Sequence, residues 1–263
     1  MNDHELAVLL ADAAGKRLLA LRAETDVPHG DEVAAKELAK LGDAQANDFL
    51  LEQLKLHRPD DAVLSEEAAD SDVRLGAERV WIIDPVDGTY EYARSQPEFA
   101  VHVALWNGVE KRLIAGAVAM PNHDLVWSTQ DEPQDVETLF IDRPLMIIAS
   151  PREPIATITK LQEGLAEIAT AHGLPGIAVM NCGSVGGKVH QILSGVADVY
   201  VSSVGFFEWD SAAPAAVALH HGLAVTEITG EPLQFNNMPP RTPSFLAARP
   251  WLYEAARAAL LSD

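Results

Sequence analysis

The stretch Val80–Ala93, VWIIDPVDGTYEYA, decides how the rest of the chain is interpreted. Its first four residues, Val80–Ile83, are apolar and predict a short buried strand. That strand runs directly into Asp84–Thr89, a segment rich in turn-forming residues. Two carboxylates on a tight turn, followed by a glycine and a hydroxyl, suit a hard cation that holds a phosphate. An ordinary turn is the alternative, since Asp-Pro and Asp-Gly are both common turn dipeptides.

The composition is that of an ordered globular protein. The 263 residues are 48% hydrophobic and 22% charged, enough for one large or two modest domains. The single cysteine, Cys182, cannot form an internal disulfide, and the N-terminal sequence lacks the pattern of a signal peptide. We therefore expect a cytoplasmic protein that does not cross a membrane, because no apolar run is long enough to do so.

The charge balance restricts the expected partners. The chain has 19 basic and 39 acidic residues, for a formal net charge of −20. Nucleic acid polymers bind basic surfaces that displace counterions, so we expect no such partner. A small phosphorylated substrate stays compatible with an acidic chain, because metal ions can invert the sign of a site locally.

Two amphipathic helices are expected near the N-terminus. Apolar residues at helical spacing predict one helix over 4–24 and a second over 43–57. Asp43 follows Gly42 and stands where the second helix needs an N-cap. Between the helices, Asp31–Leu41 is compatible with a short helix or with a mobile loop.

The helices are followed by strands that predict an antiparallel sheet. A short strand at 62–64 ends in Ser65-Glu66-Glu67, so it is a second strand that terminates in carboxylates. His102 is expected to share a sheet face with Trp106 and to be a packed or surface histidine that does not bind a metal. Further strands are predicted at 99–106, 113–120 and 125–128.

The second half of the chain alternates between strands and helices. An acidic, proline-containing segment at 131–142 is interpreted as the link between two halves, 1–142 and 143–263. The alternation predicts an α/β half, with His220 and His221 at the end of one helix. The expected strands are 145–149, 177–181, 197–201, 224–228 and 244–248, and the expected helices are 154–172, 187–193, 210–221 and 250–261.

A further acid, Asp210, stands at a predicted helix start and is followed by small residues. Taken alone, it is explained as an N-cap. The combination indicates more, because a set of acids stands at strand ends and helix starts, where α/β folds assemble ligand sites. The set is Asp43, Glu66, Asp84, Asp87 and Asp210.

Three motifs resemble the signatures of the inositol monophosphatase family of magnesium-dependent, lithium-sensitive phosphatases. They are Ser65-Glu66-Glu67, Asp84-Pro-Val-Asp-Gly-Thr89 and Trp209-Asp210-Ser-Ala-Ala213. The resemblance implies a layered αβαβα sandwich of the inositol monophosphatase and fructose-1,6-bisphosphatase type. Its N-terminal half would be α+β and its C-terminal half α/β. The run Gly42–Asn47 and the ending WDSAAP are most similar to the CysQ-type branch, which implies removal of the 3′-phosphate of adenosine 3′,5′-bisphosphate.

The resemblance also implies the metal ligands. Glu66, Asp84 and the carbonyl of Val86 would hold one Mg²⁺. A second would bind Asp84, Asp87 and Asp210, and two or three ions are expected per site. So many carboxylates stay ionised together only when cations offset their repulsion.

The resemblance implies three catalytic residues, Asp43, Glu66 and Thr89. Thr89 would hydrogen-bond the nucleophilic water, and Asp43 would accept the Thr89 proton. One ion would lower the pKa of the water while the other stabilises the leaving oxygen. Gly88 and Thr89 would also begin a helix whose free N–H groups face the phosphate, and Asp87 and Asp210 complete this part of the substrate site.

The remaining substrate contacts are implied by Gly183–Lys188, GSVGGK. This segment resembles the family's Gly-Ser segment with a downstream lysine, although the lysine lies one residue further along than in the common form. Gly183, Ser184 and Lys188 are therefore substrate-binding candidates. A simple loop is the alternative.

Tyr90 departs from the nucleotidase pattern, in which Lys or Arg follows Asp-Gly-Thr. The tyrosine removes a cation that would face a second phosphate, and Arg94 is the candidate replacement. Other substrates therefore stay open: inositol monophosphate, fructose 1,6-bisphosphate or a modified nucleoside 5′-monophosphate. A non-catalytic anion-binding module is the alternative from a different class, and a homodimer is a candidate assembly.

Overall fold

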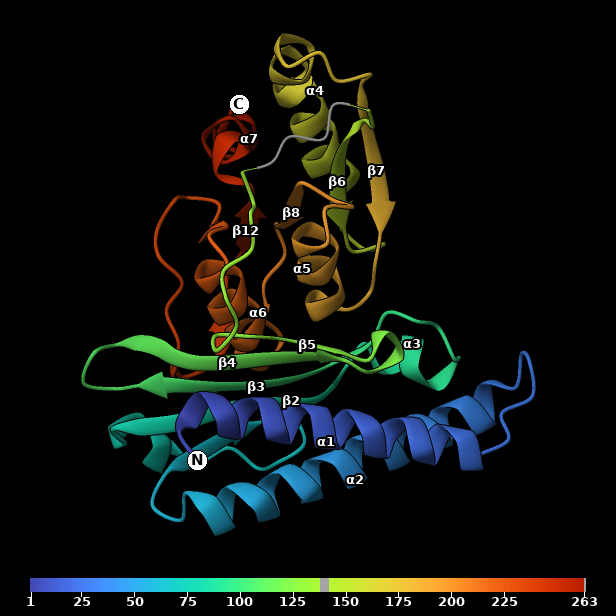
Figure 1. Cartoon of the computed structure of the whole chain (residues 1–263), viewed down its shortest axis with the longest axis vertical. Coiled ribbons are helices and arrows are strands. Elements are labelled where there is room, and N and C mark those ends of the chain that lie inside the picture. The colour runs from blue at the N-terminus through green and yellow to red at the C-terminus, as the bar shows by residue number, and fades with distance from the viewer. Residues whose placement is uncertain (138–141, 263) are drawn as a thin grey trace.

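Helix and sheet layers alternate through the molecule, from the bottom to the top of Figure 1. The computed structural model describes residues 1–137 and 142–262. A first sheet separates one pair of helices from a second pair, and a second sheet separates the second pair from a third. This αβαβα order confirms the predicted fold. The three helix pairs are α1 (Asp3–Glu24) and α2 (Glu32–His57), α5 (Val185–Leu193) and α6 (Glu208–His220), and α4 (Ile155–Ala171) and α7 (Pro250–Leu261).

Helix α2 is one continuous helix that includes the segment expected to be a short helix or a loop. Its N-cap is Asp31, which accepts hydrogen bonds from the backbone of Val33 and Ala34. The prediction that Asp43 caps a helix is therefore wrong, since Asp43 lies in the middle of α2. Gly42 marks a close approach of two helices, because a Cβ there would lie 2.5 Å from a ring carbon of Tyr92.

The first sheet has five strands in chain order, and four of them are antiparallel neighbours. The prediction of a wholly antiparallel sheet is wrong at its edge, where β1 runs parallel to β2. Parallel neighbours end at the same edge of a sheet, so the residues that follow β1 lie beside the end of β2. The strands are β1 (Ala62–Ser65), β2 (Arg79–Asp87), β3 (Ala100–Asn107), β4 (Arg112–Met120) and β5 (Leu125–Ser128), with 3₁₀ helices η1 (Asp72–Gly76) and η2 (Pro121–His123).

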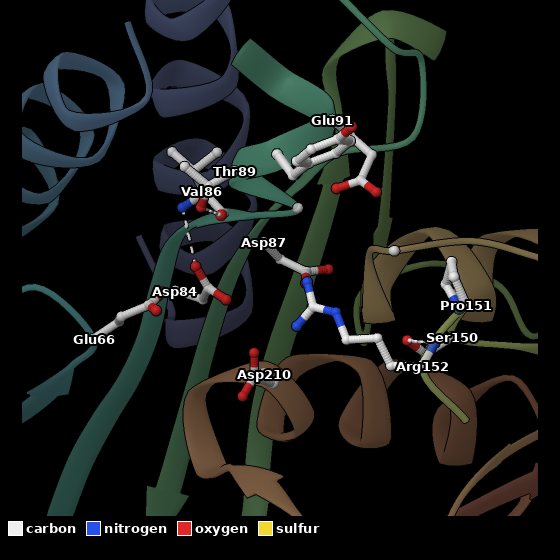
Figure 2. A pocket seen from close by; sticks show the side chains of 13 residues that line it. Glu66, Asp84, Val86, Asp87, Thr89, Glu91, Ser150, Pro151, Arg152 and Asp210 are labelled. Carbon is white, nitrogen blue, oxygen red and sulfur yellow. Dashed lines mark hydrogen bonds between the residues drawn. The ribbon is translucent and has the colours of Figure 1, made fainter. Parts of the chain in front are cut away.

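Strand β2 extends further than the apolar run predicts. It continues to Asp87, with an irregular pairing register against β3 between Asp84 and Asp87. Gly88 then adopts a φ of +86°, a conformation that favours glycine, and leads into the short helix α3 (Thr89–Ala93). The irregularity and the glycine together direct Asp84, Asp87 and Thr89 toward one side of the strand end (Figure 2).

The second sheet is mixed and has the order β10-β12-β8-β6-β7. Strand β6 pairs in parallel with both β7 and β8, whereas β12 is antiparallel to its two neighbours. Every predicted strand and helix of this half is present, with shifted ends. The strands are β6 (Leu145–Ala149), β7 (Ile177–Asn181), β8 (Val199–Ser202), β10 (Ala224–Thr226) and β12 (Phe245–Ala248), and β9 (Phe206–Phe207) pairs separately with β11 (Arg241–Thr242).

Three hydrophobic clusters hold the layers together. Alternate residues of β2 enter two of them, with Trp81 and Ile83 packed toward α1 and α2, and Val80 and Ile82 packed toward α5 and α6. The second sheet divides its side chains likewise, between the middle helices and the outer pair α4 and α7. The middle cluster contains residues from both sheets, so it joins the two halves of the chain.

Two helix starts differ from the predictions. Helix α5 begins at Val185 with Ser184 as its N-cap, and α6 begins at Glu208. The interpretation of Asp210 as an N-cap is wrong by three residues, because it lies in the first turn and accepts a hydrogen bond from Phe207 N at 2.9 Å.

The predicted link at 131–142 includes residues 138–141, which lie outside the described residues. The division of the chain at residue 142 therefore stays a prediction. In 1–137 and 142–262, none of the helices has the length and apolar character needed to cross a membrane. The predicted pair of histidines behaves as structural groups, with His220 Nε2 bonded to the Asp131 carbonyl at 2.7 Å.

Candidate active site

A pocket opens where the end of the first sheet meets the start of α6 (Figure 2). Most of its wall comes from the end of β2 and from α3, through Asp84 and Val86–Glu91. The turn after β6, Ser150–Arg152, forms the opposite side. Glu66, Gly183 and Asp210 complete the lining, so the pocket collects residues from both halves of the chain.

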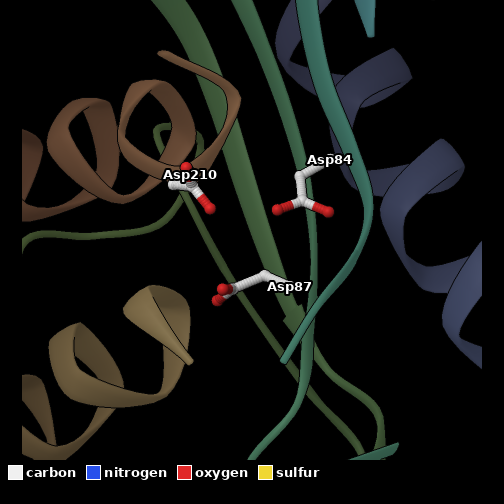
Figure 3. Close-up of side chains that lie close together, drawn as sticks. All are labelled: Asp84, Asp87 and Asp210. Atoms are coloured by element: carbon white, nitrogen blue, oxygen red, sulfur yellow. The ribbon is translucent and has the colours of Figure 1, made fainter. Parts of the chain in front are cut away.

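Three carboxyl groups converge at the pocket (Figure 3). Asp84 and Asp87 come from β2 and Asp210 comes from α6, and each contributes one oxygen within 4.8 Å of the other two. Asp84 is 1% exposed and Asp87 is 5% exposed. Carboxylate oxygens at this spacing fit a hard divalent cation, which would offset their mutual repulsion.

The surroundings of these carboxyl groups favour protonation when no cation is bound. Burial raises the pKa of Asp84 well above its ordinary value, and the neighbouring Glu66 and Asp87 raise it further. Burial followed by the charges of Asp210 and Asp43 raises the pKa of Glu66 to about 7. The pKa of Asp210 rises to about 6, through burial and then Asp87. The donor set therefore contains more negative charge than it can hold without a cation.

Asp87 is the exception because donors surround it. Its Oδ2 accepts hydrogen bonds from Ser184 Oγ at 2.5 Å and from Gly186 N at 2.8 Å. His102 Nε2 lies 3.1 Å from the same oxygen. Burial alone would raise the pKa of Asp87, but His102, Lys188 and Ser184 outweigh it and lower the pKa to about 2. Asp87 is therefore a fixed negative charge at the site.

His102 has a role that its sequence context did not indicate. It is completely buried, and its Nδ1 lies 3.2 Å from the carbonyl oxygen of Trp209. A carbonyl oxygen only accepts, so Nδ1 carries a hydrogen toward Trp209. The ring thus connects Asp87 on β2 to the residue that precedes Asp210 on α6.

Thr89 and Asp43 meet at the other side of the cluster. Thr89 Oγ1 donates to the carbonyl oxygen of Val86 at 2.9 Å. Burial and the charge of Glu67 raise the pKa of Asp43 to about 7, and the nearby Thr89 side chain opposes this rise. Helix α2 therefore brings Asp43 to Thr89 from within the helix, whereas the sequence suggested a helix start.

The segment Gly183–Lys188 lies beside the cluster, but only Gly183 lines the pocket. Ser184 is completely buried, caps α5 and donates to Asp87. Lys188 is 1% exposed, and its Nζ donates to the carbonyls of Gly183 and Ser184 at 3.0 Å each. In this geometry both side chains support the loop and Asp87 from behind. Their direct contact with a substrate stays a prediction.

Four pocket residues were not predicted from the sequence: Glu91, Ser150, Pro151 and Arg152. Burial raises the pKa of Glu91, whose carboxyl group lies where a Cβ at Gly183 would stand. The turn containing Arg152 directly follows strand β6. Glu66 was predicted because it is a charged residue that follows a strand. Arg152 also follows a predicted strand, so the same signal in the sequence points to it.

The comparison with protein families agrees with these motifs. The model of the inositol monophosphatase family matches residues 3–263. The chain belongs to the inositol monophosphatase family. This family consists of metal-dependent phosphatases, and the spacing of the three carboxyl groups fits a metal ion.

Relatives within the inositol monophosphatase family include two mycobacterial 3′-phosphoadenosine 5′-phosphate phosphatases. The protein of Mycobacterium bovis is 38% identical over 244 residues, which cover 90% of this chain and 85% of the relative. The protein of Mycobacterium leprae is 37% identical over 260 residues, which cover 95% of this chain and 90% of the relative. The crystal structure of CysQ from Bacteroides thetaiotaomicron matches this structure with a TM-score of 0.72 at 24% identity. The match covers 93% of this chain and 96% of that chain, and it supports the fold.

Proposed function

We propose that this phosphoric monoester hydrolase removes the 3′-phosphate of adenosine 3′,5′-bisphosphate, with Mg²⁺ at the carboxylate cluster. The choice of substrate rests on the similarity to the 3′-phosphoadenosine 5′-phosphate phosphatase of Mycobacterium bovis, which is 38% identical over 90% of the chain. That compound is adenosine 3′,5′-bisphosphate under another chemical name. The products are adenosine 5′-monophosphate and inorganic phosphate.

The proposed ligands are the carboxyl groups of Asp84, Asp87 and Asp210, joined by Glu66 and the carbonyl of Val86. Oxygen ligands of this kind suit Mg²⁺, and we propose two or three ions per site. Bound Mg²⁺ supplies a lowered pKa for a coordinated water and charge neutralisation for the phosphate. Asp87 is already ionised before metal binds, because its donors lower its pKa to about 2.

The other residues orient the reacting groups. The Thr89 hydroxyl, 2.9 Å from Val86 O, lies at the strand end where the nucleophilic water is expected. Asp43 lies beside this hydroxyl on α2, and its pKa of about 7 would let its carboxyl group exchange a proton near neutral pH. His102 and Ser184 hold Asp87 in place.

Tyr90 favours a second group of substrates. It lines the pocket where nucleotidases carry a cation, and it is 54% exposed. Inositol monophosphate, fructose 1,6-bisphosphate and nucleoside 5′-monophosphates are the competing candidates. All carry a phosphate monoester that the same cluster can hold.

The test is phosphate release from a panel of these compounds at equal concentration with Mg²⁺. We expect adenosine 3′,5′-bisphosphate to give the highest kcat/KM, and we expect Li⁺ to inhibit the reaction. A higher kcat/KM with inositol 1-phosphate or fructose 1,6-bisphosphate would assign the second group instead. Magnesium-dependent binding of the bisphosphate without turnover, measured by calorimetry, would support the non-catalytic alternative.

A further inference from the structure

Arg152 is the cationic side chain among the residues that line the pocket. Five carboxyl groups face it across the same pocket, and they belong to Glu66, Asp84, Asp87, Glu91 and Asp210. Figure 2 shows its guanidinium group directed into the pocket, toward Asp87 and Asp210. In the described part of the chain this group makes no ion pair within 4 Å and no side-chain hydrogen bond.

The backbone that carries Arg152 is fixed, although its side chain is not. Arg152 N donates to Ser150 Oγ at 3.2 Å, and Glu153 N donates to the Ser150 carbonyl at 2.9 Å. Glu153 is 7% exposed and accepts a hydrogen bond from Ser203 N at 2.8 Å. The turn between β6 and α4 is therefore anchored through its backbone and through Glu153, and it holds the Cα of Arg152 at the edge of the pocket.

Arg94, the replacement expected from the sequence, is held outside the pocket. Its guanidinium group forms an ion pair with Glu32 and donates to the Tyr90 carbonyl at 3.2 Å. The same group also lies 3.7 Å from the centre of the Tyr90 ring. Arg94 does not line the pocket that holds the carboxylate cluster. Tyr90 and Arg94 thus form a closed pair that leaves this wall without a cation for the substrate.

We propose that Arg152 binds the phosphate that is not hydrolysed, the 5′-phosphate of adenosine 3′,5′-bisphosphate. The inference rests on the proposed function and assigns its second anion subsite. Cations bound at the cluster would hold the 3′-phosphate, so a second phosphate needs another positive group. A guanidinium group can form two parallel hydrogen bonds to phosphate oxygens, and Arg152 is placed opposite the cluster to do so.

The experiment compares Arg152→Ala and Arg152→Lys with the unmodified enzyme, using adenosine 3′,5′-bisphosphate and adenosine 3′-monophosphate with Mg²⁺. We expect Arg152→Ala to lower the ratio of kcat/KM between bisphosphate and monophosphate by about 10–100-fold, mainly through KM. The lysine variant should recover part of this ratio, because it restores the charge without the fork geometry. Arg94→Ala is the matched control and should leave the ratio unchanged.

Binding of the product gives a readout that does not depend on turnover. Adenosine 5′-monophosphate retains the second phosphate, so calorimetric titration should show weaker binding to Arg152→Ala, again by about 10–100-fold. Inorganic phosphate, which reports on the cluster, should bind both proteins alike. An equal loss for both ligands, or no loss for the nucleotide, would overturn the role of Arg152.

The two proposals fail in different ways. If the unmodified enzyme does not prefer the bisphosphate to the monophosphate, the proposed substrate is wrong. If it prefers the bisphosphate and Arg152→Ala keeps that preference, the substrate stands and the assignment of Arg152 is wrong.

Discussion

Asp84 and Asp87 lie on the same strand end, yet their neighbours shift their pKa values in opposite directions. Asp84 is buried beside other acids, and both its burial and their charges raise its pKa. Asp87 faces His102, Lys188 and Ser184, which lower its pKa to about 2 despite burial. Asp87 is thus charged before any cation binds, whereas the raised pKa of Asp84 favours its neutral form until a cation offsets the neighbouring charges.

Substitution of either aspartate by asparagine should abolish most of the phosphate release. We expect kcat to fall by roughly 100-fold or more for Asp84→Asn and Asp87→Asn, because a ligand to the cation is lost. The two variants should differ in stability without metal. Asp87→Asn weakens the hydrogen bonds from Ser184 and Gly186 and the contact with His102, so it should lower the free energy of unfolding by about 1–3 kcal/mol, whereas Asp84→Asn should not. Phosphate release and urea unfolding with a chelator measure both effects, and near-normal turnover in either variant would remove that residue from the site.

Asp43 gives a prediction about pH that does not involve a metal ligand. Its pKa is raised from 3.8 to about 7 in the folded protein, so ionisation opposes folding increasingly between about pH 4 and 7 and fully above. Asp43→Asn removes this cost. In a chelator, the Tm of Asp43→Asn minus that of the unmodified protein should be larger at pH 8 than at pH 5, at about 2–4 °C per kcal/mol.

The control for this comparison is Asp48→Asn, an exposed carboxylate on the same helix. It should show the same Tm difference at both pH values. A Tm difference for Asp43→Asn that shrinks toward pH 8 would contradict the direction of the Asp43 shift.

At the level of elements, the sequence predicted most helices and strands. It did not predict the direction of β1 relative to β2 or the residue at which α2 begins. Hydrophobic periodicity indicates that a strand exists but not the direction of its neighbour, so the parallel pairing of β1 with β2 was missed. Gly42 and Asp43 imitate a helix start, because glycine and aspartate are common there. Both residues are instead explained by tertiary contacts. Gly42 leaves room for the ring of Tyr92, and Asp43 lies beside Thr89.

The close approach of α2 and α3 at Gly42 should be sensitive to a single methyl group. Gly42→Ala would place a Cβ 2.5 Å from the ring of Tyr92, which is itself buried and donates to the Leu18 carbonyl. We expect a loss of about 1–3 kcal/mol in the free energy of unfolding, because neither helix can shift freely. Gly76→Ala is the control, since nothing lies within 4 Å of its added Cβ. Equal stability of the two variants in urea would show that the helices accommodate the methyl group.

For the whole molecule, the sequence predicted which acids form the cluster but missed two residues beside it, His102 and Arg152. Asp84, Asp87 and Asp210 belong to motifs, and the structure brings them together. His102 and Arg152 belong to no motif in the sequence. Their positions depend on the pairing of β3 with β2 and on the packing of the second half against the first, which local patterns do not determine.

Because the proposed ligands come from distant parts of the chain, a divalent cation should stabilise the whole fold. At 100 times its dissociation constant, Mg²⁺ should add about 2.7 kcal/mol to the free energy of unfolding. Asp210→Asn should lose most of this gain, since it removes the ligand from α6. Asp26→Asn, at an exposed position between α1 and α2, should keep it. Thermal unfolding with and without Mg²⁺ makes the comparison, and an equal gain in both variants would exclude Asp210 as a ligand.

The position of Asp210 in the chain also determines when the site can be completed during synthesis. A ribosome adds about 120 residues after Asp87 before it reaches Asp210, which takes roughly 6–24 s at ordinary elongation rates. Throughout that interval the first half carries Asp43, Glu66, Asp84 and Asp87 without the helix that completes their site. The nascent chain therefore acquires its full set of proposed metal ligands late, and we expect activity only after the second half has emerged and folded.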